Sequence, residues 1–478
     1  MILLKDCYYI LTPEGSDDIR GADILIRGKR IERIAQNIDP DEAAGKGRSG
    51  PTVKAVARKS SKIEHTTDEK IEIIDCSHLV VLPGFVNTHH HFYQTLTRNL
   101  KEVQNAKLFD WLVYLYEVWK GIDADAVFYS TLLAAGELLK TGCTCATDHH
   151  YLYPQGFQGD LMGMQFEAAG RVGIRFSPCR GSMSLSKKDG GLPPDSVVQT
   201  EEQILRDSQR VIETYHDDSD ASMRKVILAP CSPFSVTEGL MRETARLARN
   251  YGVRLHTHLA ETADENDYCL RVYGKRPLSL MQDLDFVGED VSYAHGIFFE
   301  DAELELLAKT RTAVAHCPSS NMRLGSGIAR VKEMLGMGIN VGLAVDGSAS
   351  NDSSDYLGEM RQALLLQRIR YGADGMTVSD VFRLATVNGA KLLGFQDIGS
   401  IEQGKLADLA LFGIDRLEYA GSLSDPPAAL LFAGISHQTA YTIVNGRIVA
   451  RDGRLTGCDE QEVYAKANEI STRLIQSK

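Results

Sequence analysis

The chain has 478 residues, of which 43% are hydrophobic and 24% charged, and its net charge is -12. This length and composition are typical of a folded globular protein with one large domain and an appendage. The negative charge argues against a general surface for nucleic acid or for an anionic membrane. We expect no nucleic-acid partner, and small neutral or cationic partners stay open.

The cysteines and the apolar segments of the sequence both indicate where in the cell the protein is located. Nine cysteines are spread irregularly from Cys7 to Cys458, which is typical of reduced thiols rather than of a disulfide framework. The apolar segment within residues 1–6 is too short for a secretory signal, because charged residues follow it at once. No apolar run in the sequence reaches membrane-spanning length. The predicted location is cytoplasmic, with no membrane partner.

Short β-type segments at both ends of the chain predict one small β-sandwich domain built from residues 1–80 and 401–478. The N-terminal segments are residues 2–4, 8–11, 22–26 and 30–34. At the other end, residues 406–412 precede 441–449, whose Asn445-Gly446 pair predicts a hairpin, and a terminal helix follows. From about 40 to 70 the apolar pattern gives way to Gly, Ser, Lys and Glu, which predicts a mobile loop.

Between these ends, apolar β-rich segments alternate with helical patterns such as 124–140, 201–215, 237–251 and 302–308. The β-rich segments are residues 79–86, 143–147, 174–178, 226–229, 253–257, 291–294, 313–315 and 340–345. Parallel βα units of this number predict a (β/α)8 TIM-like barrel over residues 81–400, so the fold class is α/β. Barrels of this kind place their active sites at the carboxyl ends of the strands.

Chemically reactive residue types follow the predicted strands. They are His89, His91, Asp148, Arg180, Cys231, Ser232, His258, His295, His316 and Asp346. Alternate side chains of a strand share a face, so His89 and His91 are expected to point into one site while His90 points away. Neutral imidazoles bind zinc and similar divalent ions. The alternative is a group of surface histidines at a strand end.

The segment 253–261 places His256 and His258 at alternating positions, and Glu261 follows three residues later. His258 lies nearer the predicted mouth of the barrel, so we assign it to the metal and Glu261 to proton transfer. His256 is expected to be a hydrogen-bonded histidine within the barrel.

His295 and Asp346 end two further segments. Each is weak evidence alone, because a lone histidine is often structural and an Asp after a strand is often a helix cap. Together with the earlier histidines they predict a metal site with acid and base groups beside it. A divalent ion in such a site lowers the pKa of a water to about 7, which predicts hydrolysis at an electrophilic carbon. Asp346 would take a proton from the water and Glu261 would deliver one to the substrate.

Five motifs carry a resemblance to a known family. They are residues 83–91, 256–261, 294–296, 316–321 and 345–348. In this order they resemble the amidohydrolase superfamily, in its branch of cytosine, guanine and triazine aminohydrolases. The resemblance implies one divalent metal, usually zinc and sometimes iron, and catalytic roles for Glu261 and His295. The implied metal ligands are His89, His91, His258 and Asp346.

Residues 92–98, 180–186 and 229–235 resemble most closely the group of 8-oxoguanine deaminases, which are often labelled hydroxytriazine ethylaminohydrolases. The resemblance implies that 8-oxoguanine and water react to urate and ammonia. The alternatives are a hydroxytriazine, chlorotriazine or isocytosine aminohydrolase and, in a different class, a non-catalytic amidohydrolase-like binding protein. A cyclic-amide hydrolase is disfavoured, because the bridging lysine of binuclear relatives is missing after residues 226–229.

Seven side chains are candidates for contact with the heterocyclic substrate. They are Gln94, Trp111, Arg180, Cys231, Ser232, His316 and Asn321. Gln94 carries a donor and an acceptor for a ring amide, and the Arg180 guanidinium suits a ring carbonyl. The alternatives are an ordinary polar residue for Gln94, core or subunit packing for Trp111, an exposed salt bridge for Arg180 and a buried thiol for Cys231. A homo-oligomer is expected.

Overall fold

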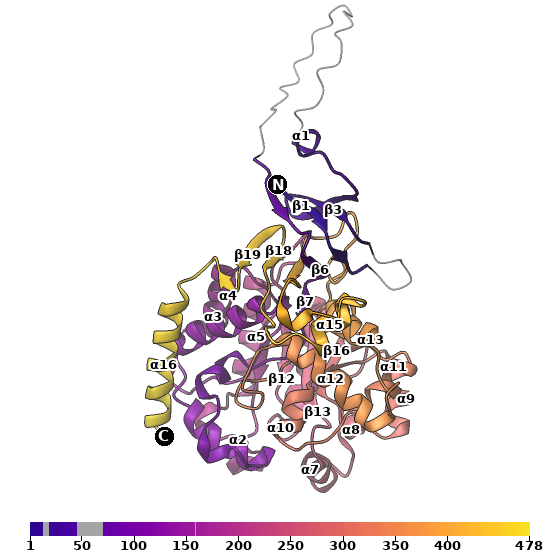
Figure 1. Cartoon of the computed structure of the whole chain (residues 1–478). Coiled ribbons are helices and arrows are strands. Elements are labelled where there is room, and N and C mark those ends of the chain that lie inside the picture. Colours follow the sequence, from indigo (N-terminus) through magenta and orange to yellow (C-terminus); the bar gives the residue numbers. More distant parts are fainter. Residues whose placement is uncertain (13–18, 45–69, 158) are drawn as a thin grey trace, which may run out of the picture.

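A computed structural model describes residues 1–12, 19–44, 70–157 and 159–478 of the chain. It consists of a helix-covered barrel and a smaller β domain that packs on one side of the barrel (Figure 1). The predicted mobile loop lies largely outside the described residues, because only its edges, 40–44 and 70, are included. Within the described ranges, no helix combines the length and the apolar character needed to cross a membrane.

The small domain is a β-sandwich that both ends of the chain build together. One sheet has the order β4 (Arg30–Ala35), β3 (Ala22–Arg27), β1 (Ile2–Cys7) and β5 (Glu72–Asp75). The other has the order β2 (Tyr9–Ile10), β6 (Leu79–Pro83), β17 (Leu409–Gly413), β18 (Tyr441–Val444), β19 (Arg447–Arg451) and β20 (Arg454–Leu455). Alternate residues from both sheets, among them Leu4, Ile24, Val81 and Leu411, form one buried core. The predicted sandwich is therefore confirmed.

The predicted hairpin near the C-terminus connects β18 and β19, which pair antiparallel. Its turn residues Asn445 and Gly446 have φ angles of 51° and 74°. Two successive positive φ angles are what a two-residue hairpin turn requires, and Asn-Gly adopts them at low cost.

The large domain is a parallel barrel, as predicted. Its strands are β7 (Phe85–Asn87), β8 (Cys143–Ala146), β10 (Arg175–Phe176), β12 (Ile227–Pro230), β13 (Arg254–Leu259), β14 (Val291–His295), β15 (Ala313–His316) and β16 (Val341–Leu343). The short strands β9 (His149–His150) and β11 (Cys179–Ser182) follow β8 and β10 and continue the sheet toward β12. The backbone N–H of Thr88 donates to Leu343 O at 3.1 Å, which joins the first barrel strand to the last.

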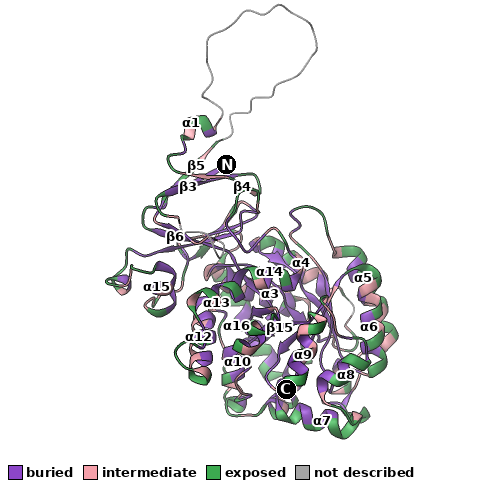
Figure 2. Ribbon diagram, turned by 90° about the vertical axis from the view of Figure 1, so that its right-hand side faces the viewer, coloured by how far each residue is buried: buried purple, intermediate pink, exposed green. Residues whose placement is uncertain are grey.

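Helices surround the barrel strands, and Figure 2 shows them with buried inner sides and exposed outer sides. Those of the barrel are α2 (Leu108–Trp119), α3 (Ala124–Lys140), α4 (Leu161–Val172), α5 (Glu201–Tyr215), α6 (Glu238–Tyr251), α7 (Ala263–Tyr273), α8 (Pro277–Asp283), α9 (Asp301–Thr310), α10 (Pro318–Arg323), α11 (Val331–Gly336), α12 (Tyr356–Tyr371), α13 (Val378–Arg383) and α14 (Gly389–Leu393). The others are α1 (Pro40–Ala43), α15 (Pro426–Phe432) and α16 (Glu460–Gln476), and α16 packs along α3 (Figure 1).

The apolar run 79–86 is divided between the two domains, whereas the sequence predicted a single barrel strand. Strand β6 belongs to the sandwich and pairs with β17, while β7 begins at Phe85 and pairs with β8. Pro83 has no N–H, so it cannot donate a hydrogen bond that would continue the ladder of the barrel strand. The N–H of Gly84 donates to Asp408 O of the other domain at 2.8 Å. A Cβ on Gly84 would lie 2.1 Å from Thr144 Oγ1, so only glycine permits this crossing.

A buried ion pair holds the two domains together at the same place. The Arg175 guanidinium donates twice to the Asp408 carboxylate, with both distances 2.9 Å, and neither side chain is exposed. Arg175 lies on barrel strand β10, and Asp408 immediately precedes strand β17 of the sandwich. A paired, bidentate contact of this kind fixes the orientation of the barrel against the sandwich.

Candidate active site

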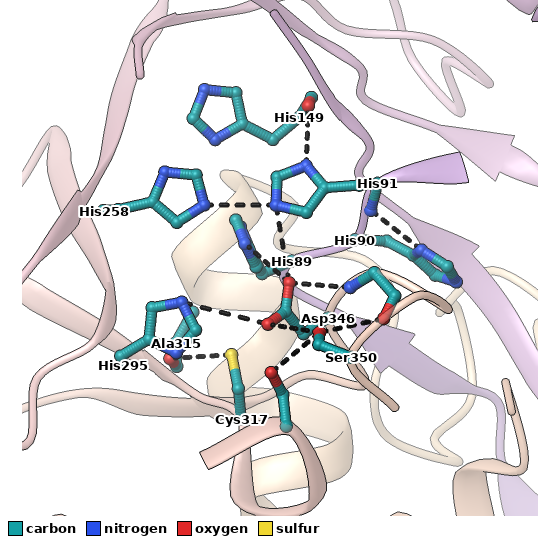
Figure 3. A network of polar contacts seen from close by, with 12 residues as sticks. His89, His90, His91, His149, His258, His295, Ala315, Cys317, Asp346 and Ser350 are labelled. Atoms are coloured by element: carbon teal, nitrogen blue, oxygen red, sulfur yellow. Dashed lines mark hydrogen bonds and ion pairs between the residues drawn. The ribbon is translucent and has the colours of Figure 1, made fainter. Parts of the chain in front are cut away.

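Three histidines and one aspartate converge at the carboxyl end of the barrel (Figure 3). His89 Nε2 lies 3.3 Å and His91 Nε2 lies 3.4 Å from the same oxygen, Asp346 Oδ1. His258 Nε2, from the end of β13, lies 3.1 Å from His91 Nε2. Residues that are up to 257 positions apart in the chain thus meet because their strands are neighbours in one closed barrel.

Hydrogen bonds behind these rings determine which ring nitrogen carries a lone pair. His91 Nδ1 donates to His149 O at 2.8 Å, and His258 Nδ1 donates to Cys231 O at 2.7 Å. Burial lowers the pKa of His91 and of His258, so both rings are neutral at pH 7. A neutral ring that donates from Nδ1 presents the lone pair of its Nε2 to the site.

His89 is held in the same way by a second histidine. Its Nδ1 lies 2.8 Å from His256 Nε2, and His256 Nδ1 lies 2.8 Å from Ser292 Oγ. Since the Ser292 hydroxyl donates to Leu255 O, it accepts from His256, which in turn accepts from His89. Burial lowers the pKa of His256 to about 3, so this ring is neutral. His256 is therefore the hydrogen-bonded histidine that its position within β13 predicted.

The geometry of these donor atoms fits a single divalent cation. His91 Nε2 and His258 Nε2 both carry lone pairs, so no hydrogen bond can join them although they lie 3.1 Å apart. Zinc bound tetrahedrally with bonds of 2.0–2.1 Å separates its ligand atoms by about 3.3 Å. The observed separations of 3.1, 3.3 and 3.4 Å match this value. A cation placed among these atoms would satisfy every lone pair.

His295 and Glu261 lie beside the cluster. His295 Nδ1 donates to Asn321 Oδ1 at 2.9 Å, and its Nε2 lies 3.5 Å from Glu261 Oε2 and 3.9 Å from Asp346 Oδ2. Burial lowers the pKa of His295, but the two carboxylates outweigh burial and raise it above its usual value. Burial raises the pKa of Glu261 to about 7. A carboxyl group with this pKa can both give and take a proton near neutral pH.

The backbone at these strand ends is held in unusual conformations. Ala260, His295 and Asp346 have φ angles of 55°, 73° and 63°, a region that residues other than glycine rarely adopt. The buried Glu265 carboxylate accepts from the N–H groups of Ala260 at 3.0 Å and Glu261 at 2.9 Å, which holds the first of these turns. Two of these turns place His295 and Asp346, whose Nε2 and Oδ2 atoms lie 3.9 Å apart.

A cavity adjoins the cluster. Helix α2 forms one wall, because Leu108, Trp111, Leu112 and Tyr116 recur with helical spacing on one of its faces. The other lining residues are His91, Gln94, Tyr151, Cys231, Phe234, His258, Glu261, His295, Leu324, Asp346 and Ser350. A cavity with apolar and aromatic walls and a few polar groups is typical of a site for a small flat ligand.

Of the seven predicted substrate contacts, Gln94, Trp111 and Cys231 line this cavity. Gln94 lies on η1 (Phe92–Thr97), and its Oε1 accepts from the N–H of Ala349 at 3.3 Å. A Cβ on Gly347 would lie 2.0 Å from this oxygen, so the glycine makes room for the amide. With its oxygen engaged, Gln94 has its amide N–H groups left to donate.

Arg180 lies elsewhere. Its guanidinium donates to Asp207 Oδ2 and to Gln199 Oε1, both at 2.8 Å, and lies over the Tyr153 ring at 3.9 Å. The residue is 1% exposed and does not belong to the cavity lining. Arg180 thus forms an ion pair that is largely buried, whereas the alternative interpretation expected an exposed one, and its contact with substrate stays a prediction.

Ser232, His316 and Asn321 are buried near the site but outside the cavity lining. Ser232 Oγ bonds Ser235 Oγ at 2.7 Å, and Asn321 holds His295 rather than facing the cavity. Burial lowers the pKa of His316 to about 3, so this ring is a neutral group within the barrel.

Sequence reasoning missed His149. One of its ring nitrogens lies within 4.8 Å of ring nitrogens of His89, His91 and His258. Its ring also stacks on that of His258, with the ring centroids 4.8 Å apart. Its Nε2 donates to Ala229 O at 2.9 Å. A signal was present, because alternation along the strand puts His149 on the same face as Cys145 and Thr147, while only Asp148 was considered. Tyr116 and Tyr151 were missed as lining residues for want of any chemical motif.

Comparison with known proteins agrees with this geometry. The model of the amidohydrolase family matches residues 80–449. An 8-oxoguanine deaminase from Pseudomonas aeruginosa is 47% identical over 84% of this chain and 89% of its own length. The hydroxydechloroatrazine ethylaminohydrolase of Pseudomonas sp. strain ADP is 36% identical over 96% of this chain and 92% of its own.

Solved structures give the same result. The atrazine chlorohydrolase of Arthrobacter aurescens, solved in complex with zinc, superposes with a TM-score of 0.89 at 26% identity, over 98% of this chain and 100% of that one. The relatives are named deaminases and aminohydrolases, and this chain is likewise a hydrolase acting on carbon–nitrogen bonds. The family match, the sequence identities and the barrel with its strand-end histidines together show that the chain belongs to the amidohydrolase family.

Proposed function

We propose that this protein is a metal-dependent deaminase that converts 8-oxoguanine and water to urate and ammonia. The observation that carries the proposal is the convergence of three neutral imidazoles, a carboxylate and a buried glutamate at one end of a largely apolar cavity. The 47% identity to an 8-oxoguanine deaminase supports this substrate in particular.

His89, His91, His258 and Asp346 would hold one divalent metal. Nitrogen and carboxylate donors favour zinc, and iron is the alternative. When bound, the metal would supply Lewis-acid activation of the attacking water. The remaining chemistry belongs to the side chains around it.

Asp346, Glu261 and His295 divide the proton transfers among them. Burial would raise the pKa of Asp346, but the imidazoles of His89, His295 and His91 around it hold that pKa well below the usual value. Asp346 is thus ionised and oriented to receive a proton from the attacking water. Glu261, with a pKa near 7, delivers a proton to the ring nitrogen next to the reacting carbon. His295, aligned by Asn321, donates a hydrogen bond to the attacking oxygen.

The substrate assignment is tested with a panel of 8-oxoguanine, guanine, isocytosine, a hydroxytriazine and a chlorotriazine. Ammonia, alkylamine and chloride release are followed with the zinc-loaded protein. We expect the highest kcat/KM for 8-oxoguanine, with one ammonia released per urate. Faster amine or chloride release from a triazine would assign the protein to the triazine hydrolases. Metal binding without turnover of any compound would favour the non-catalytic alternative.

Location and assembly are further predictions. Cysteines 7, 76, 143, 145, 179, 231, 269, 317 and 458 are all free, which supports a cytoplasmic location. A homo-oligomer is proposed, and light scattering of the purified protein tests it.

A further inference from the structure

A buried hydroxyl in the cavity wall has no hydrogen-bond partner among the described residues. Tyr116 is fully buried, lines the cavity and leaves its phenolic oxygen unpaired. Buried polar groups in folded proteins almost always find a partner, because an unpaired one is costly. The arrangement is explained if the missing partner belongs to the molecule that fills the cavity.

Tyr116 is set in its place by packing rather than by polar contacts. Its ring meets the Trp119 ring edge-on at 6.0 Å, and its hydroxyl lies near Cys231, the residue whose backbone oxygen holds His258. Leu108, Trp111 and Leu112 complete this wall of α2, so Tyr116 supplies the single hydroxyl among the four. A rigid ring that carries one donor at a fixed point is suited to selecting a ligand.

Gln94 occupies a different wall of the same cavity. Its amide oxygen accepts from the N–H of Ala349, and a Cβ on Gly347, the residue after Asp346, would lie 2.0 Å from that oxygen, so the amide lies beside Asp346. The carbon that loses its amine must lie against Glu261, His295 and Asp346, so Gln94 faces the reacting edge of a bound ring. The opposite edge then faces the wall that α2 provides.

We propose that Tyr116 is a specificity-determining residue whose hydroxyl donates a hydrogen bond to an oxo group on the ring edge remote from the reacting carbon. The proposal rests on the proposed function, and in 8-oxoguanine this acceptor is the carbonyl oxygen at C8. Burial raises the pKa of Tyr116 well above its usual value, so the hydroxyl keeps its proton and serves as the donor. None of the described lining residues is Lys or Arg, which suits an uncharged carbonyl rather than an anionic group.

Isocytosine provides the matched substrate for a test. It carries the same amino and oxo groups on its six-membered ring as 8-oxoguanine but lacks the second ring and its C8 carbonyl. Tyr116→Phe removes only the hydroxyl, and Tyr114→Phe makes the same change on a half-exposed part of α2 that does not line the cavity.

The quantity to measure is the ratio of kcat/KM for 8-oxoguanine to kcat/KM for isocytosine. We expect Tyr116→Phe to lower this ratio about tenfold or more, mainly through KM, because a buried carbonyl loses its donor. Tyr114→Phe should keep the wild-type ratio. An unchanged ratio in Tyr116→Phe, in a variant with wild-type metal content, would overturn the proposal and leave Tyr116 a packing residue.

Equilibrium binding separates this proposal from the proposed function. If the wild-type protein releases ammonia from neither compound, the deaminase assignment fails, and the dissociation constants of the two compounds then decide the role of Tyr116. Weaker binding of 8-oxoguanine alone in Tyr116→Phe supports the proposal. Equal binding by the variant and the wild type, or binding of neither compound, refutes it.

Discussion

Replacing His256 by phenylalanine tests how far the metal site depends on the hydrogen bonds behind it. The substitution removes the acceptor 2.8 Å from His89 Nδ1 and leaves that buried N–H unpaired. An unpaired buried donor costs about 1–3 kcal/mol, and about 1.4 kcal/mol corresponds to a tenfold change in an equilibrium constant. We therefore expect zinc to bind about 10- to 100-fold more weakly, in the range typical of residues that orient metal ligands.

Competition with a chelator of known affinity measures this change. His256→Gln offers an amide oxygen to His89 and should recover part of the lost affinity. Ser292→Ala breaks only the outer bond, at 2.8 Å from His256, and should have a smaller effect. His150→Phe removes a buried imidazole that does not belong to the metal-binding group and serves as the control. Zinc affinity within twofold of wild type in His256→Phe would refute the reasoning.

Three further predictions concern single side chains. Glu261→Gln should reduce ammonia release at least about 100-fold while the zinc content stays at the wild-type level, and near-normal release would remove Glu261 from its role. Gly347→Ala should displace Gln94 and raise KM for 8-oxoguanine about tenfold, whereas an unchanged KM would show that Gln94 does not bind the ring. Burial raises the pKa of Glu359 from 4.5 to about 7. Between these pH values the Glu359 carboxyl is ionised in the unfolded chain but protonated in the folded protein. The free energy of unfolding should therefore decrease by about 3 kcal/mol as the pH rises from about 4.5 to 7. In denaturant titrations the measured loss should be about 3 kcal/mol smaller in Glu359→Gln than in the wild type, because other buried carboxyl groups such as Glu261 contribute to it in both, and an equal loss in both would contradict it.

Local sequence patterns were sufficient for helices such as α3 and α5 and for separating His89 and His91 from His90. Helices α3 and α5 have the predicted bounds, because Asp123 and Thr200 cap their N-termini and apolar residues recur with helical spacing. Strand alternation alone separated His89 and His91 from His90, whose ring turns away and bonds Ser354 Oγ at 3.0 Å. These signals lie within a few residues of one another.

The apolar run 79–86 shows where such patterns fail. Hydrophobic periodicity indicates that a residue is buried, but it does not indicate in which of two hydrophobic cores the residue lies. Val81 packs in the sandwich and Phe85 in the barrel, and the change occurs at Gly84 without any polar residue to mark it. The boundary depends on Asp408 and Thr144, which contact Gly84 from distant parts of the chain.

Substrate contacts were the least predictable part of the site. Gln94 was identified by its spacing from His91, but its partner Ala349 lies 255 residues away. Arg180 was expected at the end of a strand, where site residues lie. Its guanidinium instead donates to Asp207 and Gln199, which lie 27 and 19 residues further along the chain. Tyr116 belongs to an apolar helical stripe of the kind that usually packs a core, and only the closed barrel turns that stripe into a cavity wall.

Titration of the metal-free protein with zinc, followed by the rate of ammonia release from 8-oxoguanine, tests the central claim most directly. The account predicts no release before zinc is added, a linear rise in rate, and saturation at one zinc per chain. Full activity in the metal-free protein, saturation at two zinc ions per chain, or no ammonia at any zinc concentration would contradict it.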